Sequence, residues 1–298
     1  MNKTYFGDCR TILSDLKESG FKAQMCVTSP PYFGLRDYKV EGQIGLEKTP
    51  QNYVDELVDV FRKVRDVLAD DGTLWLNLGD SYAANRSYQV TPTKWKGLDF
   101  GKSNAASVPE GLKPKDLIGI PWRVALALQA DGWYLRQDII WHKPNPMPES
   151  VKDRCTKAHE YVFLLSKSER YFFDSAAMQE PAVKGYNGSS FDKGKTFEHQ
   201  SGTCASGDRV DTLTRNRRSV WTVPSKPYAG AHFAVFPPKL IEPCVLAGSK
   251  PGDIVLDPFM GSGTTAEVAL AHGRQYVGCE LNPAYEELQN LRLAKVSA

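Results

Sequence analysis

A glycine-rich turn near the carboxyl end of the sequence has the residue types needed to bind a small ligand. The apolar run from Ile254 to Asp257 leads into Gly261-Ser262-Gly263, and a helical pattern starts at Thr264. Glycines let the backbone approach a ligand at a helix amino terminus, where unpaired N–H groups favour an anionic group. Glu280 ends the next apolar run, at the place where a carboxylate can receive ribose hydroxyls.

The same turn lacks the features of phosphate-binding loops. No Gly-Lys-Ser/Thr follows the glycines and the full GxGxxG pattern is absent, while Asp257 would repel a pyrophosphate. A ligand with a ribose, an amino group and a carboxylate but no phosphate fits better, which points to S-adenosylmethionine. Because Gly-Ser-Gly alone is also found in simple tight turns, this prediction depends on Asp257 and Glu280 together.

A second candidate, Ser29-Pro30-Pro31-Tyr32, follows the apolar run from Gln24 to Thr28. It combines a hydroxyl, two prolines that restrict the backbone and an aromatic face. In isolation the pattern is more typical of a strand that stops at proline beside a packed tyrosine.

Together, the two motifs resemble the β-class DNA amino-methyltransferases, in which the catalytic motif precedes the cofactor motif. Phe6 to Cys9, Ala231 to Leu240 and Tyr276 to Pro283 resemble further elements of that family, so the resemblance covers nearly the whole chain outside two basic loops. It implies an S-adenosylmethionine site. The residues expected to form it are Asp8, Cys9, His232, Phe233, Phe236, Asp257, Pro258, Phe259, Gly261, Gly263, Thr264, Glu280 and Asn282.

The resemblance also assigns catalytic roles to Ser29, Pro30, Pro31 and Tyr32. An exocyclic base amine is a poor nucleophile, and acceptors directed at its N–H groups can orient its lone pair. Ser29 would offer its hydroxyl and Pro30 its carbonyl, Pro31 would stiffen the loop, and Tyr32 would stack on a flipped base. The methyl group would move directly, without a covalent enzyme intermediate.

Serine in the first position of the Ser29 to Tyr32 motif makes the chain similar to the enzymes that methylate cytosine at N4. Many adenine-N6 enzymes carry aspartate at this position. A neutral and a charged acceptor can each orient an amine. Adenine N6 therefore remains the alternative to cytosine N4.

Two polar segments carry much of the basic surface, Ala83 to Lys115 and Val183 to Lys226. Loops of this length are usually functional or disordered, and a polyanion such as double-stranded DNA would explain their lysines and arginines. The candidate DNA contacts are Lys94, Lys96, Arg209, Arg215, Asn216, Arg217 and Arg218. Solvated basic loops are the alternative for both segments, and a DNA-binding protein without catalysis is the alternative function.

The elements that must position these motifs alternate between strand and helix. Apolar runs at 24–28, 73–78, 134–141, 253–257 and 275–280 predict strands, and helical spacing predicts helices at 53–68, 120–130, 264–272 and 283–295. The pattern favours an α/β fold with a doubly wound, mostly parallel, Rossmann-like methyltransferase sheet. Strands at 160–166 and 171–174 predict an antiparallel hairpin, and Asp71-Gly72 predicts a turn before 73–78.

Ligands bind at the carboxyl ends of the strands of such sheets, whatever the connectivity, so circularly permuted motifs can meet in space. Residues 1–182 are expected to form the catalytic half of a methyltransferase domain, with a loop insertion at 83–115. Residues 183–226 would be the target-recognition region, and 227–298 the cofactor-binding half.

Composition sets only broad bounds. A net charge of +2 is too small to identify a polyanion partner, and six cysteines without a CxxC pair favour reduced thiols over disulfides or a metal site. No run approaches the roughly 18 apolar residues of a membrane helix, so a cytoplasmic protein is expected. A cognate restriction endonuclease is a candidate partner, and the chain is expected to be a monomer or a homodimer. His142 could approach the target base, although a structural role is the commoner one for a lone histidine.

Overall fold

The computed structural model describes residues 1–83, 108–182, 214–225 and 236–296. Its helices are α1 (Cys9–Glu18), α2 (Pro50–Val67), α3 (Ile120–Ala130), α4 (Pro238–Gly248), α5 (Thr264–Ala271) and α6 (Tyr285–Leu293). Its strands are β1 (Asn2–Phe6), β2 (Ala23–Thr28), β3 (Leu68–Leu78), β4 (Tyr134–His142), β5 (His159–Ser166), β6 (Gln179–Pro181), β7 (Thr214–Asn216), β8 (Val220–Thr222), β9 (Ile254–Asp257) and β10 (Gln275–Glu280).

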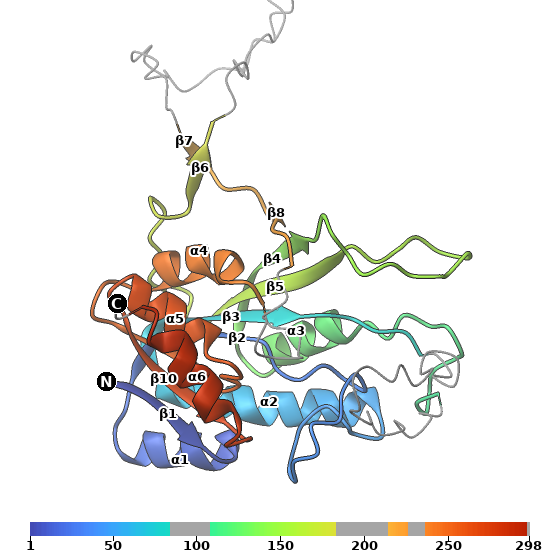
Figure 1. Cartoon of the computed structure of the whole chain (residues 1–298), viewed down its shortest axis with the longest axis horizontal. Helices are drawn as coiled ribbons and strands as arrows, with labels where there is room; N and C mark the ends of the chain where they lie inside the picture. Colours follow the sequence, from blue (N-terminus) through green and yellow to red (C-terminus); the bar gives the residue numbers. More distant parts are fainter. Residues whose placement is uncertain (84–107, 183–213, 226–235, 297–298) are drawn as a thin grey trace, which may run out of the picture.

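One sheet contains eight of these strands, in the order β1-β10-β9-β2-β3-β5-β4-β8 (Figure 1). The strands from β1 to β3 in this order run parallel, β5 is antiparallel to both β3 and β4, and β8 is parallel to β4. Strands from the two ends of the sequence are neighbours, because β10 pairs with β1 and β9 pairs with β2. The predicted mostly parallel α/β sheet with a permuted motif order is confirmed.

This topology brings distant segments to one edge of the sheet. The carboxyl ends of β10, β9, β2, β3 and β4 share that edge with the amino end of the antiparallel β5. Residues that follow β9, β2, β3 and β4, and those that begin β5, therefore lie along one line. Ligands of open α/β sheets bind at such an edge.

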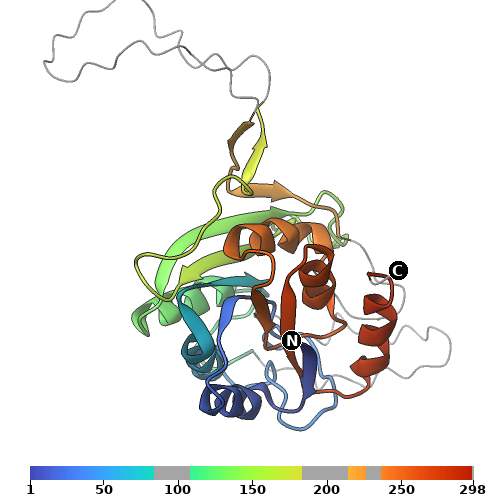
Figure 2. The same ribbon diagram turned by 90° about the vertical axis from the view of Figure 1, so that its left-hand side faces the viewer.

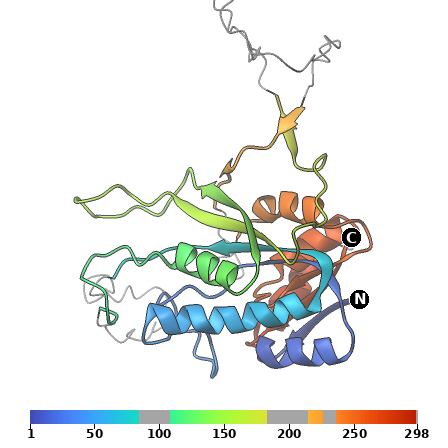
Figure 3. The same cartoon turned by 180° about the vertical axis from the view of Figure 1, so that it is seen from behind.

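Helices cover both faces because the central strands are apolar on both faces. Along β2 the side chains alternate. Cys26 packs into the core beneath α1, α2 and α3, whereas Met25 and Val27 pack into the core beneath α4 and α5. Figure 2 shows the sheet between these layers, and in Figure 3 α2 and α3 lie side by side in front of it.

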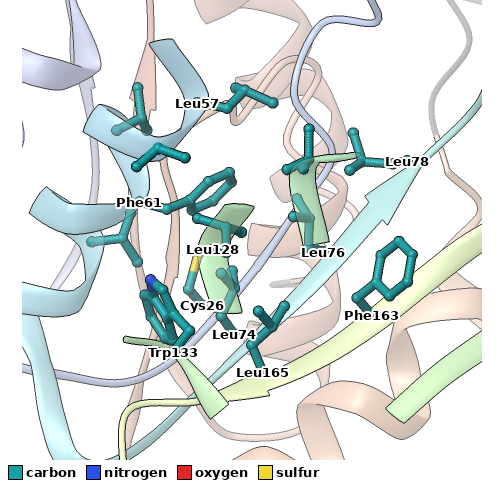
Figure 4. Close-up of a cluster of buried hydrophobic side chains, with 14 of the residues drawn as sticks. Cys26, Leu57, Phe61, Leu74, Leu76, Leu78, Leu128, Trp133, Phe163 and Leu165 are labelled. Atoms are coloured by element: carbon teal, nitrogen blue, oxygen red, sulfur yellow. The ribbon is translucent and has the colours of Figure 1, made fainter. Parts of the chain in front are cut away.

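The larger core gathers side chains from all three helices of its layer. Phe61 of α2 and Leu128 of α3 meet Leu74 of β3 (Figure 4), and all three are fully buried. Burying a side chain of this size stabilises the fold by about 1.5–3 kcal/mol. This layer holds the loops that leave β2 and β3 at the ligand edge.

Two local expectations were wrong. Residues 171–174 form no strand, because Phe172 N–H donates to Asp71 O at 2.9 Å and Asp174 N–H donates to Ala247 O at 2.8 Å. The antiparallel partners of β5 are β3 and β4. The expected turn at Asp71-Gly72 is a bulge within β3, since Ala23 pairs with Leu68 but Met25 pairs with Thr73.

A small second sheet stands away from the main body (Figure 1). It consists of β6 and β7, paired antiparallel, and the chain continues from β7 to β8 at the edge of the main sheet. Part of the predicted target-recognition region is thus anchored beside β4, while most of it lies outside the described residues.

Candidate active site

A cavity of about 620 Å³ opens at the ligand edge of the sheet. Both halves of the chain line it. Of the residues predicted from sequence, its wall includes Asp8, Cys9, Ser29, Pro30, Pro31, Tyr32, Phe236, Pro258, Phe259, Gly261, Thr264, Glu280 and Asn282. The two motifs are far apart in the sequence, but they line the same cavity. They therefore form one site.

Hydrogen bonds anchor the loop after β2 at the cavity wall. The carbonyl of Pro31 accepts a hydrogen bond from the Tyr53 hydroxyl at 2.8 Å, and the Tyr32 hydroxyl donates to Glu160 Oε2 at 2.7 Å. Ser29 Oγ lies 3.5 Å from the Tyr32 oxygen. Burial and the nearby Glu160 carboxylate raise the pKa of Tyr32, so its hydroxyl stays protonated and remains a donor.

The Tyr32 ring occupies the space beside Gly79, which has no side chain. A Cβ added at Gly79 would lie 2.5 Å from Cε2 of Tyr32, far inside contact distance. We expect Gly79→Ala to push the ring out of place and lower turnover by about 10-fold or more, because small misplacements of a positioning group are costly. Steady-state methylation kinetics would measure this. Gly72→Ala, which crowds the bulge of β3 instead, provides the control for general effects on folding; equal losses of activity in the two variants would contradict the prediction.

Several polar side chains of the cavity were not identified from sequence, among them Asn77, Lys143 and Glu160. Asn77 is the residue before the last in β3, Glu160 is near the start of β5, and Lys143 follows β4. Lys143 forms an ion pair with Glu160, and its Nζ lies 4.2 Å from the centre of the Trp141 ring. All three are polar residues near the end of a strand that lies at the ligand edge. They can be recognised as site residues only when the strand directions are known.

The glycine turn is built around Glu280. Gly261 and Gly263 have φ angles of 51° and 85°, a region that favours glycine. The Glu280 carboxylate accepts a hydrogen bond from Gly261 N–H at 2.7 Å and another from Asn282 N–H at 2.8 Å, one on each oxygen. Each oxygen keeps a second lone pair that a ligand hydroxyl can use. Burial raises the pKa of Glu280 despite these hydrogen bonds.

Asp257 and Gly263 do not line the cavity, which corrects the expected direct contact of both residues with the cofactor. The Asp257 side chain is 1% exposed and accepts hydrogen bonds from the hydroxyls of Thr28 and Thr265, both at 2.6 Å, and from Phe259 N–H at 2.9 Å. Thr28 precedes the Ser29 loop and Thr265 follows the glycine turn. Asp257 thus ties the two motifs together from behind the cavity wall, and Gly263 starts α5.

Burial raises the pKa of Asp257 from 3.8 to about 6, although the hydrogen bonds from Thr265, Thr28 and Phe259 oppose the shift. A raised folded-state pKa means that the protonated carboxyl favours the fold, so this contribution is full below about pH 4 and is lost as the pH rises through about 6. Between about pH 5 and pH 8, we expect the free energy of unfolding of the wild type to fall by about 1–2 kcal/mol more than that of Asp257→Asn. Urea unfolding at the two pH values would measure it; equal slopes for both proteins would contradict the prediction.

Asp8 and Cys9 close the cavity beside Glu280. Asp8 caps α1 by accepting a hydrogen bond from Arg10 N–H at 2.8 Å, and Arg10 also pairs with Glu56. Burial tends to raise the pKa of Asp8, but hydrogen bonds from Arg10 and its charge lower it overall, so the group is a carboxylate at neutral pH. Burial raises the pKa of the Cys9 thiol to about 12, which leaves a neutral packing group.

The candidate DNA contacts that the structure describes, Arg215, Asn216, Arg217 and Arg218, do not line the cavity. Arg215 in β7 pairs with Glu180 at 2.8 Å, and the Arg217 guanidinium lies 5.4 Å from the centre of the Trp221 ring. Asn216 ends β7, and the Arg218 carbonyl accepts a hydrogen bond from the Trp221 indole at 2.8 Å. Their contacts with DNA stay predictions. Lys94, Lys96, Arg209, His232 and Phe233 lie outside the described residues.

His142 does not line the cavity, and its Nδ1 lies 3.1 Å from the Thr222 hydroxyl, which fits the structural role. In the described ranges, no group of three or more His, Cys, Asp or Glu side chains could hold a metal ion. No helix among these residues is long and apolar enough to cross a membrane.

The chain is similar to known proteins in sequence and in fold. The sequence matches the N6/N4 methyltransferase family model, described as DNA methylase, over residues 23–291. The Type II methyltransferase M.Cfr9I of Citrobacter freundii is 50% identical over 288 residues, which cover 96% of this chain and 86% of that protein. M.SmaI, a Type II methyltransferase of Serratia marcescens, is 48% identical over 293 residues, which cover 96% and 91%. The fold is similar to that of the PvuII DNA methyltransferase (cytosine-N4-specific), with a TM-score of 0.64 at 20% identity over 99% of this chain and 90% of that one.

Proposed function

The chain belongs to the N6/N4 family of DNA methylases, and on this premise we propose that it methylates the N4 amine of a cytosine in DNA with S-adenosylmethionine. One observation carries the proposal. The glycine turn with Glu280 and the Ser29 to Tyr32 loop line the same cavity, so a cofactor and a target amine can meet there.

The residues of the glycine turn fit S-adenosylmethionine. Glu280 presents two carboxylate oxygens to the cavity edge for ribose hydroxyls. Ser262 also lines the cavity, and its buried hydroxyl has no hydrogen-bond partner within the described part of the chain, so a polar ligand group would satisfy it. Asp8, in line with the family resemblance, would lie near the adenine.

Bound S-adenosylmethionine would supply an electrophilic methyl group to the amine. Ser29 Oγ and the Pro30 carbonyl would accept the two N–H groups, turning the nitrogen lone pair towards the cofactor. The hydrogen bond from the Tyr53 hydroxyl to the Pro31 carbonyl restrains the loop that presents these acceptors. The Tyr32 ring would stack on the extruded base.

We favour cytosine N4 over adenine N6 as the target because Ser29 offers a neutral acceptor. In this respect the chain is similar to the family members that modify cytosine. Relatives of about 50% identity are named Type II methyltransferases. This supports methylation at a specific DNA sequence, with a cognate restriction endonuclease as a candidate partner.

The proposal is tested by incubating the purified chain with unmodified double-stranded DNA and methyl-labelled S-adenosylmethionine. Label should appear on the DNA, and Ser29→Ala should lower its rate of incorporation by about 100-fold, a typical loss for a transition-state acceptor. Failure to label any DNA would refute the enzymatic function and favour a DNA-binding protein without catalysis.

A further inference from the structure

The polar residues beyond Ser29 occupy a distinct end of the cavity. Along the ligand edge the strand order places the cofactor segments of β10 and β9 on one side of β2, and β3, β5 and β4 on the other. A base whose amine is held at Ser29 must therefore extend its ring towards the residues of β3, β5 and β4. Those that line the cavity there are Asn77, Glu160, Trp141 and Lys143.

Glu160 connects this end of the cavity to the catalytic loop. Its Oε2 accepts the hydrogen bond from the Tyr32 hydroxyl at 2.7 Å, and its Oε1 pairs with Lys143 Nζ. Its side chain is only 15% exposed, so both partners are held in one geometry. The Glu160 carboxylate thus fixes the position of the Lys143 ammonium relative to the Tyr32 ring.

Lys143 keeps a hydrogen-bond donor for a ligand. An ammonium has three N–H donors and no acceptor. Glu160 takes one donor, and the indole face of Trp141 lies 4.2 Å from the nitrogen. In contrast, Asn77 is committed to the protein, since its amide donates to Tyr161 O at 3.0 Å and its oxygen lies 3.2 Å from the Tyr32 oxygen. Lys143 is accordingly the strongest donor that this end of the cavity offers.

We propose that Lys143 reads the O2 carbonyl of the target cytosine, with Glu160 as its positioning residue. This inference rests on the proposed function and adds a determinant of base choice to it. Cytosine carries its N4 amine and its O2 carbonyl at opposite ends of one Watson–Crick edge. With the amine at Ser29, the carbonyl points towards the β5 and β4 side of the cavity.

Adenine cannot satisfy the same donor. At the corresponding end of its Watson–Crick edge it presents a C–H group, so the Lys143 ammonium, whose side chain is only 20% exposed, would lose water without gaining an acceptor. Sites built to hydrogen-bond one substrate group reject analogues that lack it far more strongly than apolar pockets reject a missing methylene. Lys143 would therefore select cytosine, and Ser29 alone would not have to do so.

The test compares Lys143→Met with the wild type on unmodified DNA. We expect kcat/KM for DNA to fall by about 100-fold or more, with the Kd for S-adenosylmethionine unchanged. Lys143→Arg should retain part of the activity, because a guanidinium can also donate. Lys17→Met, which removes an exposed ion pair between Lys17 of α1 and Asp66 of α2, is the matched control and should behave as the wild type.

An unpaired Glu160 could by itself disturb the site in Lys143→Met. The double variant Lys143→Met/Glu160→Gln removes that charge and should be equally slow. Recovery of wild-type rates in the double variant, or full activity of Lys143→Met, would overturn the inference.

A substrate analogue isolates the carbonyl. Once the modified position is mapped, it can be replaced by a 2-aminopyridine C-nucleoside, which keeps the amine and the ring nitrogen and has C–H in place of the O2 carbonyl. The wild type should lose about as much rate on this analogue as Lys143→Met loses on cytosine, and Lys143→Met should lose little more; independent losses would overturn the inference. A wild type that methylates adenine or no DNA would instead show that the proposed function itself has failed.

Discussion

Replacing Asp257 with alanine is expected to weaken S-adenosylmethionine binding by about 100-fold and to lower the free energy of unfolding by about 2–4 kcal/mol. The side chain is buried and does not line the cavity. Its removal leaves the hydroxyls of Thr28 and Thr265 and the N–H of Phe259 without their buried acceptor. The glycine turn and the end of β2 would then lose their common anchor.

Calorimetric titration with S-adenosylmethionine and urea unfolding would measure the two effects of Asp257→Ala. Asp253→Ala is the matched control, because Asp253 precedes β9 and its carboxylate accepts one hydrogen bond, from Lys250 N–H at 2.7 Å, away from the cavity. Wild-type cofactor affinity in Asp257→Ala would contradict the account of how the two motifs are held together.

Tyr32→Ala should lower kcat by about 100- to 10,000-fold while the Kd for S-adenosylmethionine stays close to the wild-type value. The variant removes the face on which the extruded base stacks, and it releases Glu160 from its hydrogen bond with the hydroxyl. Because the cofactor segments of β9 and β10 are on the other side of β2, they should be unaffected. Single-turnover methylation together with cofactor titration separates the two quantities.

Tyr32→Phe is the informative partner of this variant. It keeps the ring against Gly79 and loses only the hydrogen bond to Glu160, so we expect a loss of about 10-fold. A Tyr32→Phe enzyme as impaired as Tyr32→Ala would show that the hydroxyl, and not the aromatic face, carries the function of this residue.

The sequence contained enough information to place the two main motifs. Apolar runs that stop at Asp257 and at Ser29 predicted strands with polar residues at one end, and a parallel sheet brings such ends together. The cavity that both motifs line follows from that rule. The permuted strand order could be stated only through the family resemblance, because periodicity does not give the neighbours of a strand.

The polar residues at the far end of the cavity could not be predicted in the same way. Glu160 precedes an apolar run instead of following one, and only the antiparallel direction of β5 brings it to the ligand edge. Lys143 depends on this strand, since its ion pair spans β4 and β5. The expected hairpin at 171–174 failed for a related reason: backbone partners come from distant segments such as Ala247, which local propensity does not reveal.

Asp257 shows a different limit of sequence reasoning. A carboxylate at the end of a strand beside a glycine turn is typical of a ligand contact, yet this one is enclosed by two threonines. Thr28 is over two hundred residues away in the sequence, so no local pattern relates it to Asp257. The distinction between a residue that touches a ligand and one that holds a loop requires the three-dimensional contacts.

We propose that one cavity brings S-adenosylmethionine and the N4 amine of cytosine together. The decisive experiment treats unmodified DNA with the purified protein and the cofactor, digests the DNA to nucleosides and identifies them by mass spectrometry. We expect N4-methyldeoxycytidine, absent from DNA treated without the cofactor. N6-methyldeoxyadenosine as the product would contradict the assignment of the base, and the absence of any methylated nucleoside would contradict the function.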